Sequence, residues 1–222
     1  QAKRKVKEAC NARYEENLRI INKITLDDLL PSMIDSIDGE TKELTTCTDI
    51  YGPETPAGSG MLTLATLDLE NLADKIETLA VIGEEGQVYS STEALYLTTS
   101  SKYVLSARAS GLWEEETSGL YKFDISSDPK KTVYRGSGTV EGRLLNQFSL
   151  GEYEGYLRVG TTSGSAWWGE NSLNNHLTVF KEENGKLVVT GKLSDLGQGE
   201  EIYSARFIGT RGFMVTFFTT DP

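Results

Sequence analysis

A seven-residue pattern recurs along this chain at nearly constant spacing, and it limits the possible folds more than any other feature of the sequence. YKFDISS at 121–127 resembles ATLDLEN at 65–71 and TVFKEEN at 178–184, so the copies begin 56 and 57 residues apart. In the copy at 121, apolar residues alternate with polar ones, which is typical of a strand that is buried on one face. Self-similarity at a fixed period indicates a repeat architecture.

A second marker repeats in step with the first. YLTT begins at 96, YLRVGTT at 156 and FMVTFFTT at 213, at distances of 60 and 57 residues. Because this marker always falls on the same side of the first one, the two markers belong to one repeating unit.

One period contains four strand candidates separated by turn signals. In the most complete period they are VYSS, ALYLTTS, GLYKFDI and TVYRGSGTV. The next period includes Asn184-Gly185, a dipeptide that is the strongest short signal for a β-hairpin. Four-stranded units repeated every 40 to 60 residues or so are typical of β-propeller blades, because radial stacking buries both faces of each sheet.

The predicted fold is therefore mainly β, with four-stranded antiparallel blades of the β-propeller type. Complete blades cover about residues 88–140 and 144–193, and half blades cover about 62–82 and 202–218. These segments add up to about three blade equivalents, whereas closed propellers have at least about four blades. We expect an incomplete ring, which either belongs to a longer chain or closes by self-association.

Residues 1–50 have a different pattern and are predicted to form a short α-helical segment and linker before the partial propeller at 51–222. The stretch YGPETPAGSG at 51–60 contains two prolines and three glycines, a composition that breaks regular structure. It marks the boundary between the two regions.

Two helices are expected in the N-terminal region. Apolar residues at steps of four and three predict an amphipathic helix over 2–24. Thr25 and Asp28 have the spacing of a capping box and predict a second short helix, which Pro31 interrupts or restarts.

Composition and motifs exclude several classes of function. The formal net charge of −11 repels nucleic acid and anionic lipid headgroups. No apolar run approaches the length of a membrane span, so we expect no membrane insertion by this segment. The sequence has no glycine-rich phosphate loop, no calcium-binding loop and no CxxC pair, and we predict no cofactor or metal.

Catalytic signals are weak. His176 is the only histidine, and its place at the start of a strand favours a structural role. The 33 acidic residues leave open a carbohydrate-active hydrolase that uses paired carboxylates on the propeller face. Because no catalytic motif is present, a non-catalytic binding or structural module is the favoured interpretation.

The clearest candidate binding site lies in two corresponding connections. Between the second and third strands, GLWEEETSG at 111–119 and SAWWGEN at 165–171 both place tryptophan near glutamate. Equivalent loops emerge on the same face of a propeller, where aromatic side chains favour binding of a polypeptide or a sugar. The alternative is that the tryptophans cover blade edges or pack on the N-terminal helices. The candidate residues are Trp113, Glu114, Glu115, Glu116, Trp167, Trp168 and Glu170.

Several stretches resemble a family of secreted or surface proteins of bacteria and archaea. The similar stretches are CTDIYGPETP at 47–56, GRLLNQFSLGEYEGYLRVGTT at 142–162, LGQGEEIYSARFIGTRGFMVTFF at 196–218 and the closing TTDP. The family carries a C-terminal β-propeller domain distantly related to WD repeats, and its propeller continues with further blades beyond TTDP. The resemblance implies an extracytoplasmic domain of a longer chain and brings no catalytic motif.

Two further expectations depend on this resemblance. The chain itself shows no secretory signal, so a secreted or cell-surface location is implied by the resemblance alone. In such a compartment, Cys10 and Cys47 are candidates for a disulfide that ties the helical segment to the propeller entry. We therefore expect an extracytoplasmic β-propeller module with a protein or glycan ligand.

Overall fold

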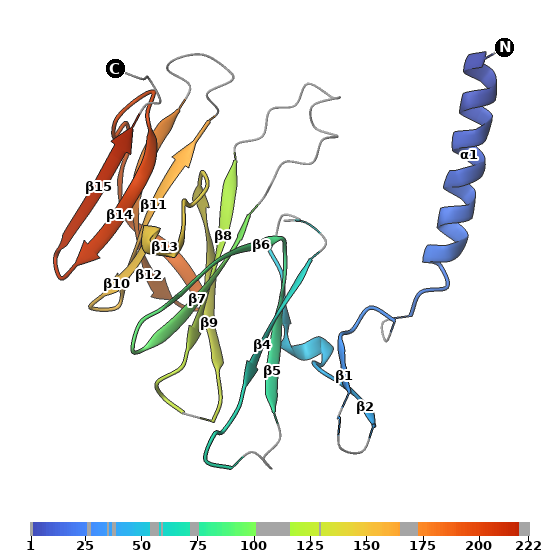
Figure 1. Cartoon of the computed structure of the whole chain (residues 1–222), viewed down its shortest axis with the longest axis horizontal. Helices are drawn as coiled ribbons and strands as arrows, with labels where there is room; N and C mark the ends of the chain where they lie inside the picture. The colour runs from blue at the N-terminus through green and yellow to red at the C-terminus, as the bar shows by residue number, and fades with distance from the viewer. Residues whose placement is uncertain are drawn as a thin grey trace. The chain divides into compact units, whose positions relative to one another are not determined.

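The structure is a computed structural model of the 222-residue chain (Figure 1). It describes residues 2–25, 28–34, 36, 39–53, 58, 60–71, 76–100, 116–128, 130–164 and 173–217. The chain divides into two compact units, 1–49 and 50–222.

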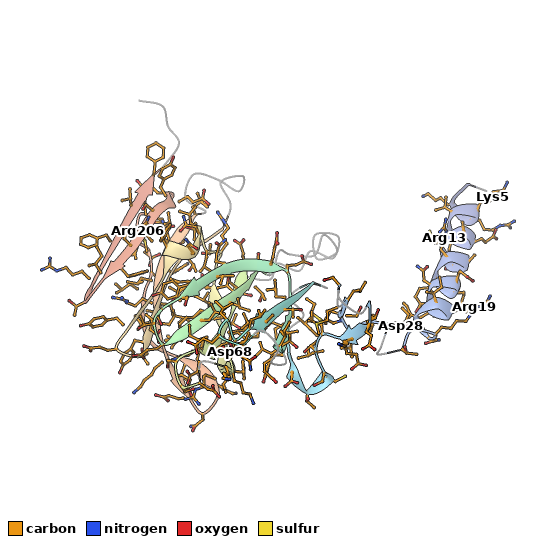
Figure 2. All side chains as sticks on the ribbon, turned by 60° about the horizontal axis from the view of Figure 1, so that its bottom comes forward. Lys5, Arg13, Arg19, Asp28, Asp68 and Arg206 are labelled. Carbon is orange, nitrogen blue, oxygen red and sulfur yellow. The ribbon has the colours of Figure 1, made fainter. Side chains whose placement is uncertain are left out.

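The N-terminal helix is confirmed. Helix α1 spans Ala2–Ile21 and is rich in strong helix formers, with an ion pair of 3.3 Å between Arg4 and Glu8 one turn apart. Figure 2 shows Lys5, Arg13 and Arg19 projecting from this helix. A 3₁₀ turn at Cys47–Asp49 ends the first unit.

The prediction of a second helix after Thr25 was wrong. Both the backbone N–H and the hydroxyl of Thr25 donate to the carboxylate of Asp28, at 2.8 and 2.7 Å, but the chain makes only a turn there. Strand β1 (Ser32–Ile34) then pairs antiparallel with β2 (Thr41–Glu43). Proline cannot donate a helical hydrogen bond, and the carbonyl of Pro31 instead accepts from the N–H of Leu44 at 2.9 Å.

The second unit contains two complete four-stranded antiparallel meanders, as predicted. We call the first one blade 1 and the second one blade 2. Blade 1 consists of β6 (Glu85–Ser90), β7 (Ala94–Ser100), β8 (Thr117–Asp124) and β9 (Val133–Glu141). Blade 2 consists of β10 (Leu150–Tyr153), β11 (Tyr156–Ser163), β12 (Asn174–Glu183) and β13 (Lys186–Leu193), preceded by a 3₁₀ turn at Gln147–Ser149.

Two incomplete sheets flank the blades. The first half blade pairs β4 (Met61–Thr66) with β5 (Glu77–Ile82), and the short β3 (Ile50–Tyr51) lies parallel to β5. The last half blade is the hairpin of β14 (Glu201–Ile208) and β15 (Arg211–Phe217). The mainly β fold with four-stranded antiparallel blades is confirmed, and β3 is a strand that the sequence pattern did not predict.

Side-chain alternation buries both faces of blade 1. Tyr96 and Leu120 belong to a buried cluster that blade 1 shares with blade 2, in which Phe180 is 1% exposed. The neighbouring residues Leu97 and Tyr121 point to the opposite face and join a second cluster with the first half blade. Successive side chains of a strand point to opposite faces, so one strand contributes to two cores.

Glycines let blade 1 and blade 2 touch backbone to backbone. A Cβ added at Gly136 of β9 would lie 2.7 Å from the carbonyl carbon of Gly185, and one at Gly138 would lie 2.8 Å from the carbonyl oxygen of Leu187. Gly185 belongs to the predicted Asn184-Gly185 turn, in which both residues have positive φ, 52° and 79°. This turn closes the β12–β13 hairpin, as the sequence predicts.

Candidate functional site

The candidate site lies at one end of the blades, where the connections between second and third strands leave the sheets. The ends of β9, β11 and β13 and the starts of β8 and β12 all meet at this end, because neighbouring strands are antiparallel. We call this end the loop face. Glu116 is the only candidate residue that the structure describes; the others, Trp113, Glu114, Glu115, Trp167, Trp168 and Glu170, lie outside the described residues.

Arg143 ties the bases of the two tryptophan-bearing connections together. Its Nη1 donates to the carboxylate of Glu116 at 2.9 Å and to the carbonyl of Gly164 at 2.8 Å. Glu116 follows the first connection directly, and Gly164 directly precedes the second. One guanidinium group therefore holds the starting points of both connections within a few ångströms of each other.

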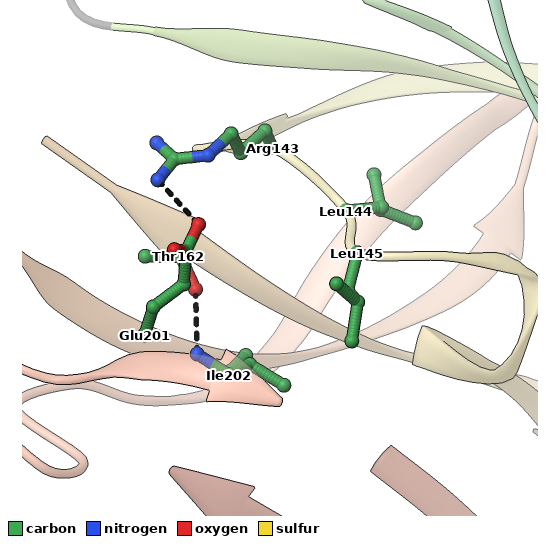
Figure 3. Close-up of a pocket in the computed structure, with 6 residues that line it drawn as sticks. All are labelled: Arg143, Leu144, Leu145, Thr162, Glu201 and Ile202. Atoms are coloured by element: carbon green, nitrogen blue, oxygen red, sulfur yellow. Dashed lines mark hydrogen bonds and ion pairs between the residues drawn. The ribbon is translucent and has the colours of Figure 1, made fainter. Parts of the chain in front are cut away.

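The same arginine also reaches the last half blade. Its Nη2 donates to Glu201 at 2.7 Å (Figure 3). Its backbone N–H and carbonyl pair with Thr162 at 2.9 and 3.0 Å, so the main chain fixes where the side chain starts. Burial lowers the pKa of the Arg143 guanidinium, but the hydrogen bonds and charges of Glu201 and Glu116 outweigh it and raise the pKa above its usual value.

A pocket of about 240 Å³ opens beside this arginine (Figure 3). It combines a charged pair with the apolar side chains of a linker. The lining residues are Arg143, Leu144, Leu145, Thr162, Glu201 and Ile202. The Thr162 hydroxyl accepts from the N–H of Ile202 at 3.3 Å and closes the floor between β11 and β14.

A second polar group on the loop face surrounds the histidine. The Nε2 of His176 lies 2.9 Å from the Ser163 hydroxyl and 3.2 Å from the Glu141 carboxylate, and its Nδ1 lies 3.2 Å from the Ser194 hydroxyl. Lys192 binds the other oxygen of Glu141 at 2.6 Å. We call these five residues the His176 cluster.

The neighbours of His176 determine its protonation. Burial lowers the pKa of the imidazole below its ordinary value of 6.5, although the charge of Glu141 opposes this effect. The ring is therefore neutral at pH 7, with the proton on Nε2 facing the carboxylate and with Nδ1 accepting from Ser194. The hydrogen bond from Lys192 lowers the pKa of Glu141, which stays ionised.

The carboxylates that the structure brings together on the loop face are bound by cations. Glu116 and Glu201 share Arg143, and Glu141 is paired with Lys192. This arrangement is typical of structural ion pairs rather than of a general acid opposite a nucleophile. No group of three or more His, Cys, Asp or Glu is placed to hold a metal ion within the described part of the chain.

Asn175 anchors the linker that follows blade 2. Its side-chain amide donates to the carbonyls of Leu196, Gly197 and Glu200 at 2.7, 3.1 and 2.9 Å. Its Oδ1 accepts from the Thr162 hydroxyl at 2.7 Å. The side chain is fully buried, so every polar atom needs these partners.

The two cysteines are free thiols in the structure, and both are exposed. They both belong to the first unit, whose boundary lies after Asp49. The structure does not contain a bridge between Cys10 and Cys47, and the pairing stays a prediction.

The stacked four-stranded meanders define a protein of the β-propeller class. Over residues 3–222 the chain matches the family described as Beta propeller domain, and it belongs to that family. No described helix is long and apolar enough to cross a membrane.

Two archaeal relatives are similar to about half of the chain. An uncharacterized protein of Methanocaldococcus jannaschii is 41% identical over 111 residues, which are 50% of this chain and 16% of the relative. An uncharacterized protein of Archaeoglobus fulgidus is 45% identical over 109 residues, or 49% of this chain and 15% of the relative. The matched part of the chain thus spans about a sixth of the length of these relatives.

Sequence reasoning missed Arg143 and the His176 cluster as centres of interaction. The partners of Arg143 are 27 and 58 residues away in sequence. The repeat offers one usable signal, because Ser118 in blade 1 and Asn175 in blade 2 are 57 residues apart and both are polar at the start of a third strand. Polar residues at equivalent positions of a repeat indicate a shared structural task.

Proposed function

We propose that this chain is an extracytoplasmic β-propeller module that binds a protein or a glycan on its loop face without catalysis. The observation that carries the proposal is the pair of bonds from Arg143 to Glu116 and Gly164. They fix the bases of the two connections that bear Trp113, Trp167 and Trp168 on one rigid scaffold. Aromatic side chains presented from loops on a rigid scaffold are suited to a polypeptide or to the face of a sugar ring.

The extracytoplasmic location is supported by the resemblance to secreted and surface proteins with a C-terminal propeller distantly related to WD repeats. The charge of −11 also suits a partner that is neither nucleic acid nor an anionic membrane. Protease treatment of intact cells that produce the parent protein tests the location, because a surface domain is cleaved while a cytoplasmic control protein survives.

Intrinsic fluorescence tests the binding proposal directly, because the three tryptophans of the chain all lie in the two connections. The probes are a glycan array and a library of immobilised peptides, followed by titration of each binder in solution. We expect a binder to shift or quench tryptophan emission and to lose about tenfold or more in affinity when Trp167 and Trp168 are both changed to alanine.

Tyr156→Ala is the matched control, because Tyr156 is a part-exposed aromatic at the opposite end of β11. This variant should retain full affinity. Binders that leave the emission unchanged, or that respond equally to both variants, would contradict the loop face as the binding surface. New reducing ends on a bound oligosaccharide would instead favour the carbohydrate-active hydrolase.

A further inference from the structure

Two strands of the second unit have an open edge. In the sheet order β3-β5-β4, strand β4 is the terminal strand, and in the hairpin β14-β15 strand β15 has one partner only. No described strand pairs with the free edge of either one. An exposed edge presents unpaired N–H and C=O groups and is a template for another strand.

The hairpin also leaves one apolar face uncovered. On the side facing blade 2, Ile202 and Ala205 are buried, and Met214 approaches Gly160. The opposite side carries large apolar side chains that are between 52% and 72% exposed, and they form a continuous patch along both strands. These residues are Tyr203, Ile208, Phe213, Val215 and Phe217.

The repeat identifies which strands are missing beside these edges. FMVTFFTT in β15 matches YLTT of β7 and YLRVGTT of β11, so β15 is a second strand. ATLDLEN begins in β4 and matches the third strands β8 and β12. In both complete blades the second and third strands are antiparallel partners. Strand β15 therefore lacks a third strand, and β4 lacks a second one.

The faces of the two half blades fit each other when β15 pairs with β4. In the first half blade, Leu62 and Leu64 of β4 pack toward blade 1. Placing β4 beside β15 in the antiparallel register of the complete blades sets the uncovered patch, including Phe213 and Val215, in line with these leucines. The patch then packs against a blade 1, in the manner of the second strand of a complete blade.

The number of blades decides between closure within one chain and closure between chains. One chain closed on itself would have three blades, and three chains would give nine. Two chains give four complete blades and two composite ones, a ring of six, and only this total lies in the usual range of about four to eight blades.

We propose that a second copy of this chain is the partner of the open edges, with β15 of each copy pairing antiparallel with β4 of the other. The edge strands suit this contact, because MLTLAT is uncharged and RGFMVTF carries a single arginine. The net charge of −11 on each copy opposes association at low ionic strength, so salt strengthens the dimer.

Light scattering after size-exclusion chromatography tests the proposal on the intact chain. We expect a mass of twice 24.4 kDa that is retained on dilution and is favoured by salt. Val215→Lys places a charge in the exposed patch and Thr63→Lys places one on the exposed side of β4, and each should weaken the dimer by about tenfold or more. Val189→Lys is the matched control, because Val189 is a half-exposed valine on β13 outside the proposed contact and should leave the dimer unchanged.

Mixing the two disrupted variants distinguishes β15–β4 pairing from a sticky patch. A mixed pair contains one composite blade in which both strands are unaltered, so equimolar Val215→Lys and Thr63→Lys chains should form heterodimers that neither variant forms alone. Unchanged circular dichroism of both variants excludes misfolding as the cause.

Three results would overturn the proposal. A monomer at all concentrations and salt levels would leave the open edges to other segments of a longer protein. A Thr63→Lys chain that dimerises like the unaltered one would indicate contact of β15 with β15. A mixture with no heterodimer would exclude the composite blade.

Discussion

Blade 1 and blade 2 follow the same path, and they use a polar residue at the same place for the same purpose. In blade 1 the Ser118 hydroxyl donates to the carbonyl of Gly142, which begins the linker to blade 2, at 2.8 Å. In blade 2 the residue 57 positions later, Asn175, donates to three carbonyls of the next linker. Each blade thus fastens the start of its successor through its third strand, with a longer side chain where the linker takes a wider turn.

The next position differs completely between the two blades. Gly119 follows Ser118, and a Cβ there would lie 2.4 Å from the Thr99 hydroxyl. His176 follows Asn175 and is the centre of a charged cluster that includes Glu141 at the end of blade 1. The repeat preserves the bond that joins blades and lets the neighbouring position change, so titratable chemistry occurs in one blade only.

The largest effect is expected from removing the equivalent core rings. Phe123 and Phe180 are 57 residues apart, are at most 1% exposed, and each faces the preceding blade. Changing either one to alanine should lower the free energy of unfolding by about 3–5 kcal/mol. Urea denaturation measures both losses; a much smaller loss for Phe123→Ala would show that the contact with the first half blade is weaker than the contact between complete blades.

The linker anchors should differ in strength. Asn175→Ala leaves three buried carbonyls without their donor and should cost about 3 kcal/mol, whereas Ser118→Ala removes one hydrogen bond and should cost about 1 kcal/mol. Thermal unfolding followed by circular dichroism provides the comparison. Equal losses would mean that the extra bonds of Asn175 add no net stability.

The glycine contact between the blades can be tested with an internal control. Gly136→Ala forces a Cβ to within 2.7 Å of the backbone of Gly185, and we expect a loss of about 2 kcal/mol. Gly191→Ala, on β13, meets only the Cβ of Val179 at 4.0 Å and should be nearly neutral. If both variants unfold at the same denaturant concentration, the blades are not held at backbone contact in solution.

The smallest effect separates the blades by pH. Because burial lowers the pKa of His176 in the folded state, the unfolded chain binds the proton more strongly, and stability falls as the pH drops below about 6.5. The charged groups around the ring, Glu141, Lys192 and Asp195, are those that influence this titration. In His176→Gln, the loss of stability between pH 7.5 and 5.5 should be smaller than in the unaltered chain, by about 1.4 kcal/mol for each unit of pKa shift. An equal loss in both proteins would exclude His176 as the group responsible.

The sequence predicted the blades well because their signal is local and repeated. Alternation over six to ten residues and a turn such as Asn184-Gly185 specify a hairpin without reference to the rest of the chain. The prediction was wrong at residues 25–37, where the bonds between Thr25 and Asp28 are present but do not start a helix. Pairing of Ser32–Ile34 with Thr41–Glu43 prevailed there over local helix propensity.

The candidate site was predicted less completely, for a physical reason. Glu116 was identified because it lies beside the tryptophans, but Arg143 acts through partners that only the stacking of blades brings near. A salt bridge between positions 27 or 58 residues apart leaves no periodic trace in a single sequence. The His176 cluster likewise joins the ends of four strands from two blades.

The close approach at Gly136 and Gly138 limits how such a chain can evolve. In β9 two positions accept no side chain because the hairpin turn of the following repeat occupies that space. The fourth strand of blade 2, which carries Thr190 and Lys192 on either side of Gly191, is not shaped for the same neighbour. Recombination that exchanged the two repeats would therefore fail even though their strands match, so the order of repeats along the gene is under selection as much as the repeats themselves.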